Sequence, residues 1–147
     1  RDIHPPNKQE VGRRLSLWAL AKTYGKTVPS YCGPLFSSAK FQDGKATLSF
    51  SHVDGGLKSL DGKSLTWFTI AGADKKFVPA TAEIVGKQIA VSAPGVKKAA
   101  AVRFGWNQIA EPNLGNAAGL PASPFRTDKW TDATMPEVAV PAPPARK

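Results

Sequence analysis

The pattern of hydrophobic and polar positions divides the chain into a short helical part and a longer part with the period of β-strands. In the first part, four apolar residues recur at three- and four-residue spacing, which is typical of one helix face: Val11, Leu15, Trp18 and Ala19. Asn7 and Glu10 match the N-cap and N3 positions of a capping box, and Gly25 suits the left-handed position after a helix. The pattern predicts an amphipathic helix over residues 8–24.

The apolar face of this helix would meet water if the helix stood alone. Exposure of several large apolar side chains costs on the order of a few kcal/mol. We therefore expect the face formed by Val11, Leu15 and Trp18 to be covered. The candidates for the cover are the β-domain that follows, a second copy of the chain and a missing chain segment.

Beyond Gly33 and Pro34, apolar and polar residues alternate in short segments bounded by turn residues. The predicted strands are residues 35–41, 45–51, 65–71, 77–79, 81–85, 88–92 and 99–106. The first two flank Asp43-Gly44, a pair that accepts the positive φ of a tight hairpin turn. Residues 65–71 are predicted to be buried on both faces, and residues 107–128 are predicted to form a long loop, either functional or wrapped over a neighbouring part of the domain.

Short strands without intervening helices predict a mainly β protein built as a β-sandwich, jelly-roll-like in form. We expect a domain boundary that separates residues 1–26, a loop and a helix, from the β-sandwich at residues 30–130. Residues 131–147 are rich in proline and poor in bulky apolar groups, which indicates a tail or linker.

Composition limits the classes of protein to which this chain can belong. The chain has 147 residues, of which 41% are hydrophobic, and a formal net charge of +9. Its basic residues occur as scattered pairs, and most of its aromatic residues fall at core positions, which argues against nucleic-acid binding. A run of about twenty apolar residues is lacking, so we expect no membrane-spanning segment. The single cysteine, Cys32, excludes an intrachain disulfide and is expected to be a small buried residue.

Only two histidines, His4 and His52, can provide acid–base chemistry near neutral pH. From the residues alone, His4 reads as a surface histidine beside Pro5-Pro6, although Asp2 is close enough to orient its imidazole in a catalytic triad. For His52 we favour a strand-end residue that hydrogen-bonds within a glycine loop over a functional pair with Asp54. No glycine-flanked serine nucleophile is present, so this chain by itself is expected to be catalytically silent.

Metal and sugar sites have less support in the pattern. Two histidines, one cysteine and dispersed carboxylates offer no recognised ligand spacing, and no metal or organic cofactor is expected. Tryptophans can stack on sugars, but Trp18 and Trp67 fit core positions better. Trp106 and Trp130 remain as candidates for a surface platform.

Several segments in matched order resemble the C-terminal part of the sialate O-acetylesterase family of carbohydrate esterases, which are related to acetylxylan esterases. The matching segments are residues 2–5, 7–12, 70–74, 77–80, 102–106 and 119–128. The resemblance covers about residues 1–130, and the last segment, from Gly119 to Asp128, is specific.

The resemblance implies that His4 is the histidine of a Ser-His-Asp triad whose serine lies upstream of this chain. The acid is either Asp2 or a residue outside the chain. It also implies that helix 8–24 ends a flavodoxin-like serine-hydrolase domain and that the substrate is an O-acetylated sugar, either sialic acid or an acetylated hemicellulose. A periplasmic or secreted enzyme is suspected from the family, and its oligomeric state is open.

The leading hypothesis is therefore the C-terminal fragment of a carbohydrate O-acetylesterase. Its expected partners are the remainder of the catalytic domain and an O-acetylated carbohydrate, and a second copy of the chain is a further candidate. The alternative is a non-catalytic carbohydrate-binding or structural β-module. A functional role for His4 and exposed tryptophans on the β-domain are the features that separate these two hypotheses.

Overall fold

The structure is a computed structural model and describes residues 6–130. Its helical part begins with α1 (Lys8–Trp18) and continues without a break as a π-helical stretch, η1 (Ala19–Thr23). The Asn7 side chain accepts a hydrogen bond from the Glu10 amide at 3.0 Å, which is the predicted N-cap. Gly25 has a φ of 60°, as predicted for the position after the helix. Only the change to π-helical bonding within the predicted segment was unforeseen.

The first sheet has the strand order β1-β2-β7-β6, with all neighbours antiparallel. Its strands are β1 (Leu35–Gln42), β2 (Lys45–Ser51), β6 (Thr81–Val85) and β7 (Gln88–Ser92). Asp43 and Gly44 join β1 to β2 with φ values of 48° and 74°, so both residues of the turn are left-handed. The predicted hairpin and all four strands are confirmed.

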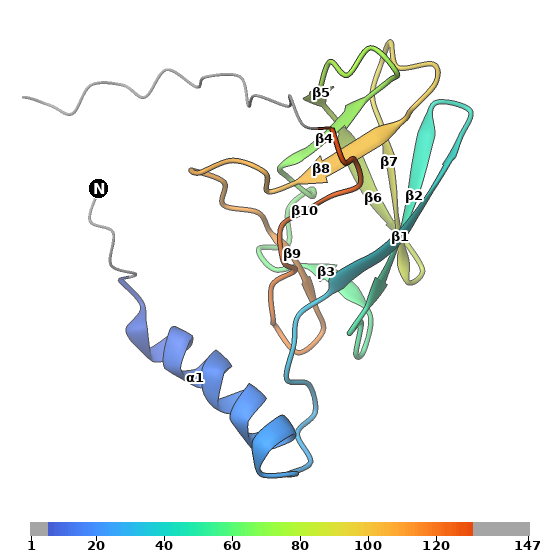
Figure 1. The fold of residues 1–147 in the computed structure, drawn as a ribbon. Coiled ribbons are helices and arrows are strands. Elements are labelled where there is room, and N and C mark those ends of the chain that lie inside the picture. The colour runs from blue at the N-terminus through green and yellow to red at the C-terminus, as the bar shows by residue number, and fades with distance from the viewer. Residues whose placement is uncertain (1–5, 131–147) are drawn as a thin grey trace, which may run out of the picture.

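The second sheet has the order β10-β8-β4-β5, and a third, two-stranded sheet pairs β3 with β9. The strands of these sheets are β3 (Leu57–Ser59), β4 (Phe68–Ala71), β5 (Val78–Pro79), β8 (Ala101–Phe104), β9 (Leu114–Asn116) and β10 (Phe125–Arg126). Figure 1 shows the strands in chain order as the colour passes from cyan to red.

Two predicted strands are shorter than expected, because a left-handed residue ends the extended backbone at one end of each. The strand predicted over 65–71 begins only at Phe68, since Trp67 has a φ of 63°. The strand predicted over 99–106 ends at Phe104, since Gly105 has a φ of 58°. Within the shortened β4, Phe68, Ile70 and Ala71 are buried.

The prediction of a loop over residues 107–128 was wrong in part, because this segment contains β9 and β10. The glycine-rich segment that ends at Leu57 also leads directly into β3. Leu114 and Phe125 are buried in the core and each belongs to a strand of two or three residues. The segment wraps over the domain and supplies part of its core, which agrees with the expectation that a long loop here covers a neighbour.

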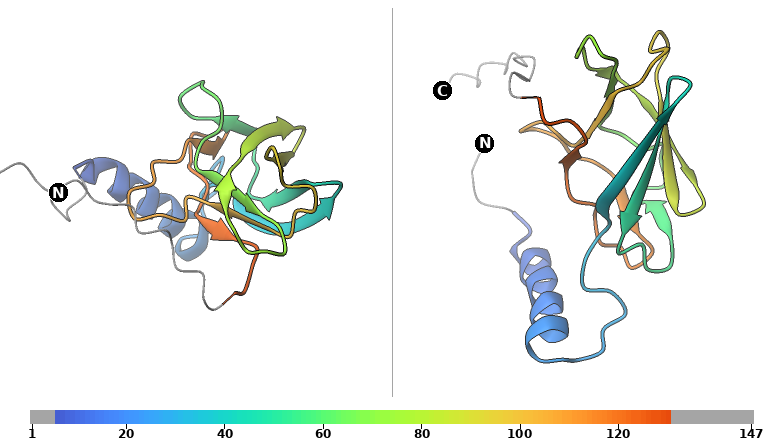
Figure 2. Two further views of the ribbon diagram at one scale, coloured as in Figure 1. Left: turned by 90° about the horizontal axis from the view of Figure 1, so that it is seen from above. Right: turned by 45° about the vertical axis from the view of Figure 1, so that its right-hand side comes forward.

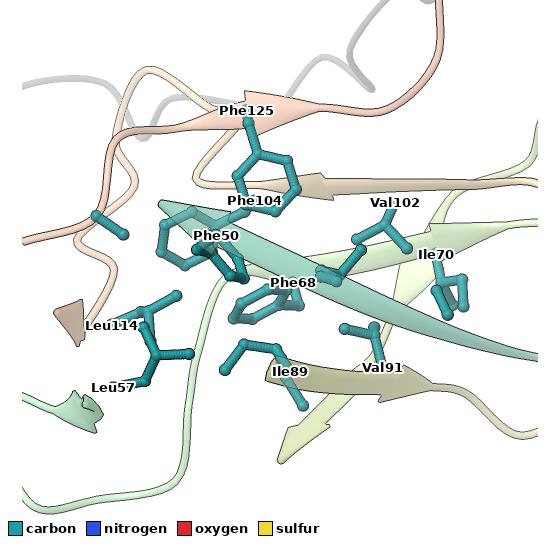
Figure 3. Packing of buried hydrophobic residues seen from close by; sticks show 14 residues of the cluster. Phe50, Leu57, Phe68, Ile70, Ile89, Val91, Val102, Phe104, Leu114 and Phe125 are labelled. Carbon is teal, nitrogen blue, oxygen red and sulfur yellow. The ribbon is translucent and has the colours of Figure 1, made fainter. Parts of the chain in front are cut away.

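The hydrophobic core lies between the two four-stranded sheets and is closed at one end by the third sheet. Phe50, Ile89 and Val91 come from the first sheet and face Phe68 and Val102 of the second, as Figure 3 shows. The core is rich in aromatic contacts; the rings of Phe68 and Phe104 lie 4.6 Å apart. The prediction of a mainly β domain is confirmed, with three antiparallel sheets.

The helix stands apart from the sheets, and a linker connects it to β1 (Figures 1 and 2). None of its residues is buried, and Leu15 is 66% exposed. Of the three candidates for the cover, the β-domain leaves this face exposed except for the contact of Tyr31 with Trp18. A second copy and a further chain segment remain as candidates. The placement of Trp18 and Trp67 in the core was wrong, because both are surface-exposed.

Candidate functional site

The two residues predicted to be catalytic, His4 and Asp2, lie outside the described residues, so their roles stay predictions. The chain immediately after them is described. Asn7 caps α1, and the Glu10 carboxylate accepts hydrogen bonds at 2.7 Å from both Arg13 and Arg14. These bonds lower the pKa of Glu10 to about 2. The helix therefore begins at a defined residue only four positions after His4.

A ladder of aromatic rings joins the helix to the β-domain. The Trp18 ring meets the edge of Tyr31 at a centroid distance of 5.0 Å, and Tyr31 meets His52 at 5.2 Å. The Lys22 ammonium lies 4.6 Å from the centre of the Tyr31 ring, which is a cation–π contact. Tyr31 in the linker therefore contacts both the helix, at Trp18, and the end of β2, at His52.

Asn116 on β9 holds the linker to the β-domain. It is fully buried, and its amide nitrogen lies 3.0 Å from the Cys32 carbonyl, 3.2 Å from the Ser30 hydroxyl and 3.2 Å from the His52 carbonyl. Its oxygen accepts a bond from the Leu120 amide at 3.1 Å. One side chain therefore fastens three segments that are far apart in the sequence.

This network decides between the two interpretations of His52. The residue directly follows β2, has a φ of 55° and uses its carbonyl in the Asn116 network, so it is a strand-end residue as predicted. Its hydrogen-bond partner is on β9, however, and not within the glycine loop. The Asp54 carboxylate accepts a bond from the Ser30 hydroxyl at 2.9 Å, and no bond between Asp54 and His52 is seen.

A second polar centre lies at the opposite end of β3. The Asn113 amide donates to the Asp61 carboxylate at 2.9 Å and to the Ser64 carbonyl at 2.9 Å, and its oxygen accepts from the Thr66 amide. Hydrogen bonds from Ser59, the Lys63 amide and Asn113 lower the pKa of Asp61 to about 2. Asn113 therefore orders the turn that leads into β4.

An open groove with a volume of about 540 Å³ borders this turn. It is lined by Ser59, Lys63, Ser64, Leu65 and residues 80–84 on and before β6. The lining combines hydroxyl groups, the Lys63 ammonium, the Glu83 carboxylate and aliphatic side chains.

The outer face of the second sheet carries a buried ion pair. The Arg103 guanidinium donates two hydrogen bonds to the Asp128 carboxylate, at 2.9 Å and 2.8 Å, and the two side chains are only 5% and 1% exposed. The bonds from Arg103 lower the pKa of Asp128. Arg103 also lies 4.0 Å from the centre of the Phe77 ring. The pair fastens the chain after β10 onto β8.

Residues 6–130 show no centre for a metal ion or a disulfide. In that part of the chain, no three His, Cys, Asp or Glu side chains gather closely enough to hold a metal. Cys32 is a free, buried cysteine as predicted, and burial raises the pKa of its thiol. No helix in the same range is long and apolar enough to cross a membrane.

Sequence reasoning missed the residues that connect distant segments, namely Asn113, Asn116 and the pair Arg103–Asp128. Asn113 and Asn116 fall in the segment predicted to be a loop, where asparagine is common and gives no sign of burial. Asp128 belongs to the segment 119–128, which carried the family resemblance. In the structure, this segment packs into the β-domain, since Leu120, Ala122 and Phe125 are also buried.

The chain is similar to one solved structure in particular, the crystal structure of a carbohydrate acetylesterase from Xanthomonas citri. The two are 45% identical over 88% of this chain, with a TM-score of 0.83. The chain spans only 30% of the length of that protein. No protein-family model matches the chain, and no match is found among curated protein sequences. The similarity shows that a segment resembling most of this chain occurs within a larger carbohydrate acetylesterase.

Proposed function

We propose that this chain is part of a carbohydrate O-acetylesterase, in which it supplies the histidine of a Ser-His-Asp triad and an accessory β-domain. The observation that carries this proposal is the 45% identity to a carbohydrate acetylesterase over 88% of the chain. The sugar would be an O-acetylated sialic acid or an acetylated hemicellulose, and the enzyme would act in the periplasm or after secretion.

In the proposed reaction, His4 takes the proton of a serine hydroxyl that lies in another part of the protein. The serine oxygen attacks the acetyl carbonyl, and His4 then gives the proton to the sugar oxygen as its bond to the acetyl group breaks, so that the sugar leaves with a free hydroxyl. Water, activated by the same histidine, releases acetate from the acetyl-serine. Asp2, or an acid elsewhere in the protein, would hold the imidazole in its reactive orientation. No cofactor takes part.

The exposed face of α1 supports the idea that a further domain packs here. Val11, Leu15 and Trp18 are 42%, 66% and 44% exposed, although their spacing is that of a buried face. We propose that this face packs on a flavodoxin-like hydrolase domain, for which the other 70% or so of the similar acetylesterase leaves room. The cap at Asn7 would then hold the His4 loop at the boundary between the two domains.

The test uses a longer protein that contains both this chain and the hydrolase domain. Replacing His4 by alanine should lower kcat for 4-nitrophenyl acetate by on the order of 10³-fold or more, because the triad loses its base. His52→Asn is the matched control: it changes the other histidine, and asparagine tolerates the φ of 55° at that position. Full activity in His4→Ala would refute the assignment, as would an equal loss in both variants.

A further inference from the structure

The outer face of the second sheet presents a row of residues in register across all four strands. Arg126 on β10 pairs with Arg103 on β8, which pairs with Thr69 on β4, which pairs with Pro79 on β5. Their neighbours along the strands, such as Val102 and Ile70, point into the core. Because side chains alternate along a strand, the row itself points away from the core.

The chain after β10 crosses this row and leaves aromatic groups on both sides of the Arg103–Asp128 pair. Figure 1 shows this last described segment, in red, running past β8 toward β5. Its end, Trp130, lies 5.8 Å from the ring of Phe77. The segment is held by the Asp128 carboxylate and by the Thr127 hydroxyl, which accepts a bond from the Val102 amide at 2.9 Å. These bonds therefore define the position of Trp130, and of its contact with Phe77, relative to the second sheet.

At one end of the row, a cation stands beside an exposed tryptophan. Trp106 is 41% exposed, and the Arg126 guanidinium lies 5.5 Å from the centre of its ring. The Arg126 guanidinium also lies 3.9 Å from the Asp128 carboxylate, an ion pair that is longer than a hydrogen bond. Its side chain is 34% exposed, so a ligand in solution can reach it.

The other end repeats this arrangement with a lysine. The Lys75 ammonium lies 5.6 Å from the centre of the half-buried Trp130 ring, and Lys75 itself is exposed. The exposed residues Lys76, Lys97 and Lys98 lie on the two adjoining loops, which meet where the Ala100 amide donates to the Ala71 carbonyl at 2.8 Å. Two basic pairs that are separate in the sequence, Lys75-Lys76 and Lys97-Lys98, therefore lie on adjoining loops.

We propose that this face is a binding site for an anionic carbohydrate, a glycan that carries uronic acid residues. Pyranose rings would stack on Trp106 and Trp130, since aromatic faces bind the apolar faces of sugars. The carboxylates would pair with Arg126 and Lys75, because a guanidinium donates two parallel bonds to a carboxylate. The choice of a sugar polymer rests on the proposed function. The choice of an acidic one rests on the cations of this face.

The experiment measures binding of the 147-residue chain by isothermal titration calorimetry to oligogalacturonate and to neutral xylo-oligosaccharides of equal length. We expect saturable binding to oligogalacturonate that weakens with salt, and weaker binding to the neutral sugar. Trp106→Ala and Arg126→Gln should each weaken the binding by about tenfold. Trp18→Ala and Arg13→Gln are matched controls, since they remove an exposed tryptophan and an exposed cation from the helix instead.

Equal binding of the neutral sugar, or equal losses in the helix controls, would overturn the proposal. Single-stranded DNA of similar charge tests for simple charge attraction; binding that is as tight as that of oligogalacturonate and indifferent to Trp106→Ala would also overturn it. If Trp106→Ala fails to fold, Arg126→Gln and Lys75→Gln decide, because both change exposed or partly exposed groups. Hydrolysis of 4-nitrophenyl acetate by the longer protein needs no glycan, so loss of glycan binding and failure of the esterase proposal are read separately.

Discussion

The pair Arg103–Asp128 offers the sharpest test of how the β-domain is held together. The Arg103 side chain is only 5% exposed, and Asp128→Ala would remove the carboxylate that it binds. Breaking a buried ion pair by removing one partner costs about 3–5 kcal/mol. The Phe77 ring, 4.0 Å from that guanidinium, offsets a small part of this cost. We expect the free energy of unfolding in urea to fall by about 3 kcal/mol, a value at the lower end of that range.

Two further variants separate the ion pair from simple loss of packing. Replacing both partners by apolar residues, in Arg103→Met with Asp128→Leu, should cost less than Asp128→Ala alone, because no buried charge is left without a partner. Glu10→Gln removes an exposed carboxylate that binds Arg13 and Arg14, and it should leave the free energy of unfolding almost unchanged. A loss below about 0.5 kcal/mol in Asp128→Ala would refute the reasoning from buried charge.

The same pair predicts a dependence on pH whose sign follows from the pKa of Asp128. Hydrogen bonds from Arg103 lower this pKa in the folded protein, so ionised Asp128 stabilises the fold above its unfolded pKa of about 3.9. This stability is lost as the pH falls through the folded value. The difference in stability between the wild type and Asp128→Asn should be constant from about pH 5 to pH 8 and should narrow below about pH 4. A difference that stays constant when the pH falls below about 4 would contradict the role of the charge.

Three further substitutions test the packing of the linker and the helix. A methyl group at Gly33 would lie 1.9 Å from the Pro121 carbonyl oxygen, so Gly33→Ala should lower the melting temperature sharply. Gly12 on α1 has open space around it instead. Gly12→Ala should therefore raise helicity in circular dichroism and add about 0.5–1 kcal/mol of helix stability. Asn116→Ala leaves several buried groups without partners and should cost more than about 2 kcal/mol in urea unfolding; a smaller loss would show that water replaces the side chain. Leu15→Lys should leave the melting temperature of this chain unchanged because Leu15 is 66% exposed, but should destabilise the longer protein if α1 packs on the hydrolase domain.

Local patterns predicted those parts of the fold whose causes are local. The cap at Asn7, the left-handed Gly25 and the hairpin at Asp43-Gly44 each depend on a few consecutive residues, and all three are confirmed. The alternation of Ala46, Leu48 and Phe50 likewise decides which face of β2 is buried. Period, caps and turn residues are sufficient for such elements because their hydrogen bonds close within a short stretch of chain.

Contacts between distant segments decided the rest. The strands β3, β9 and β10 have two or three residues each, too few to show a period, and they exist because partners 21 to 59 positions away pair with them. Asn116 reads as an ordinary loop residue until the fold brings three carbonyl or hydroxyl groups to its amide. The roles of His4 and Asp2 remain predictions that rest on the resemblance and on the similar acetylesterase.

The sequence by itself determined the amphipathic helix and the mainly β domain, because periodicity and turn chemistry act over a few residues. Only the tertiary structure decided that residues 6–130 leave the apolar face of α1 exposed, that Trp18 and Trp67 are exposed, and that Arg103 is buried against Asp128. Burial of a side chain depends on which distant elements meet it. The same reason explains why Lys75-Lys76 and Lys97-Lys98, which are far apart in the sequence, come to adjoining loops only after folding.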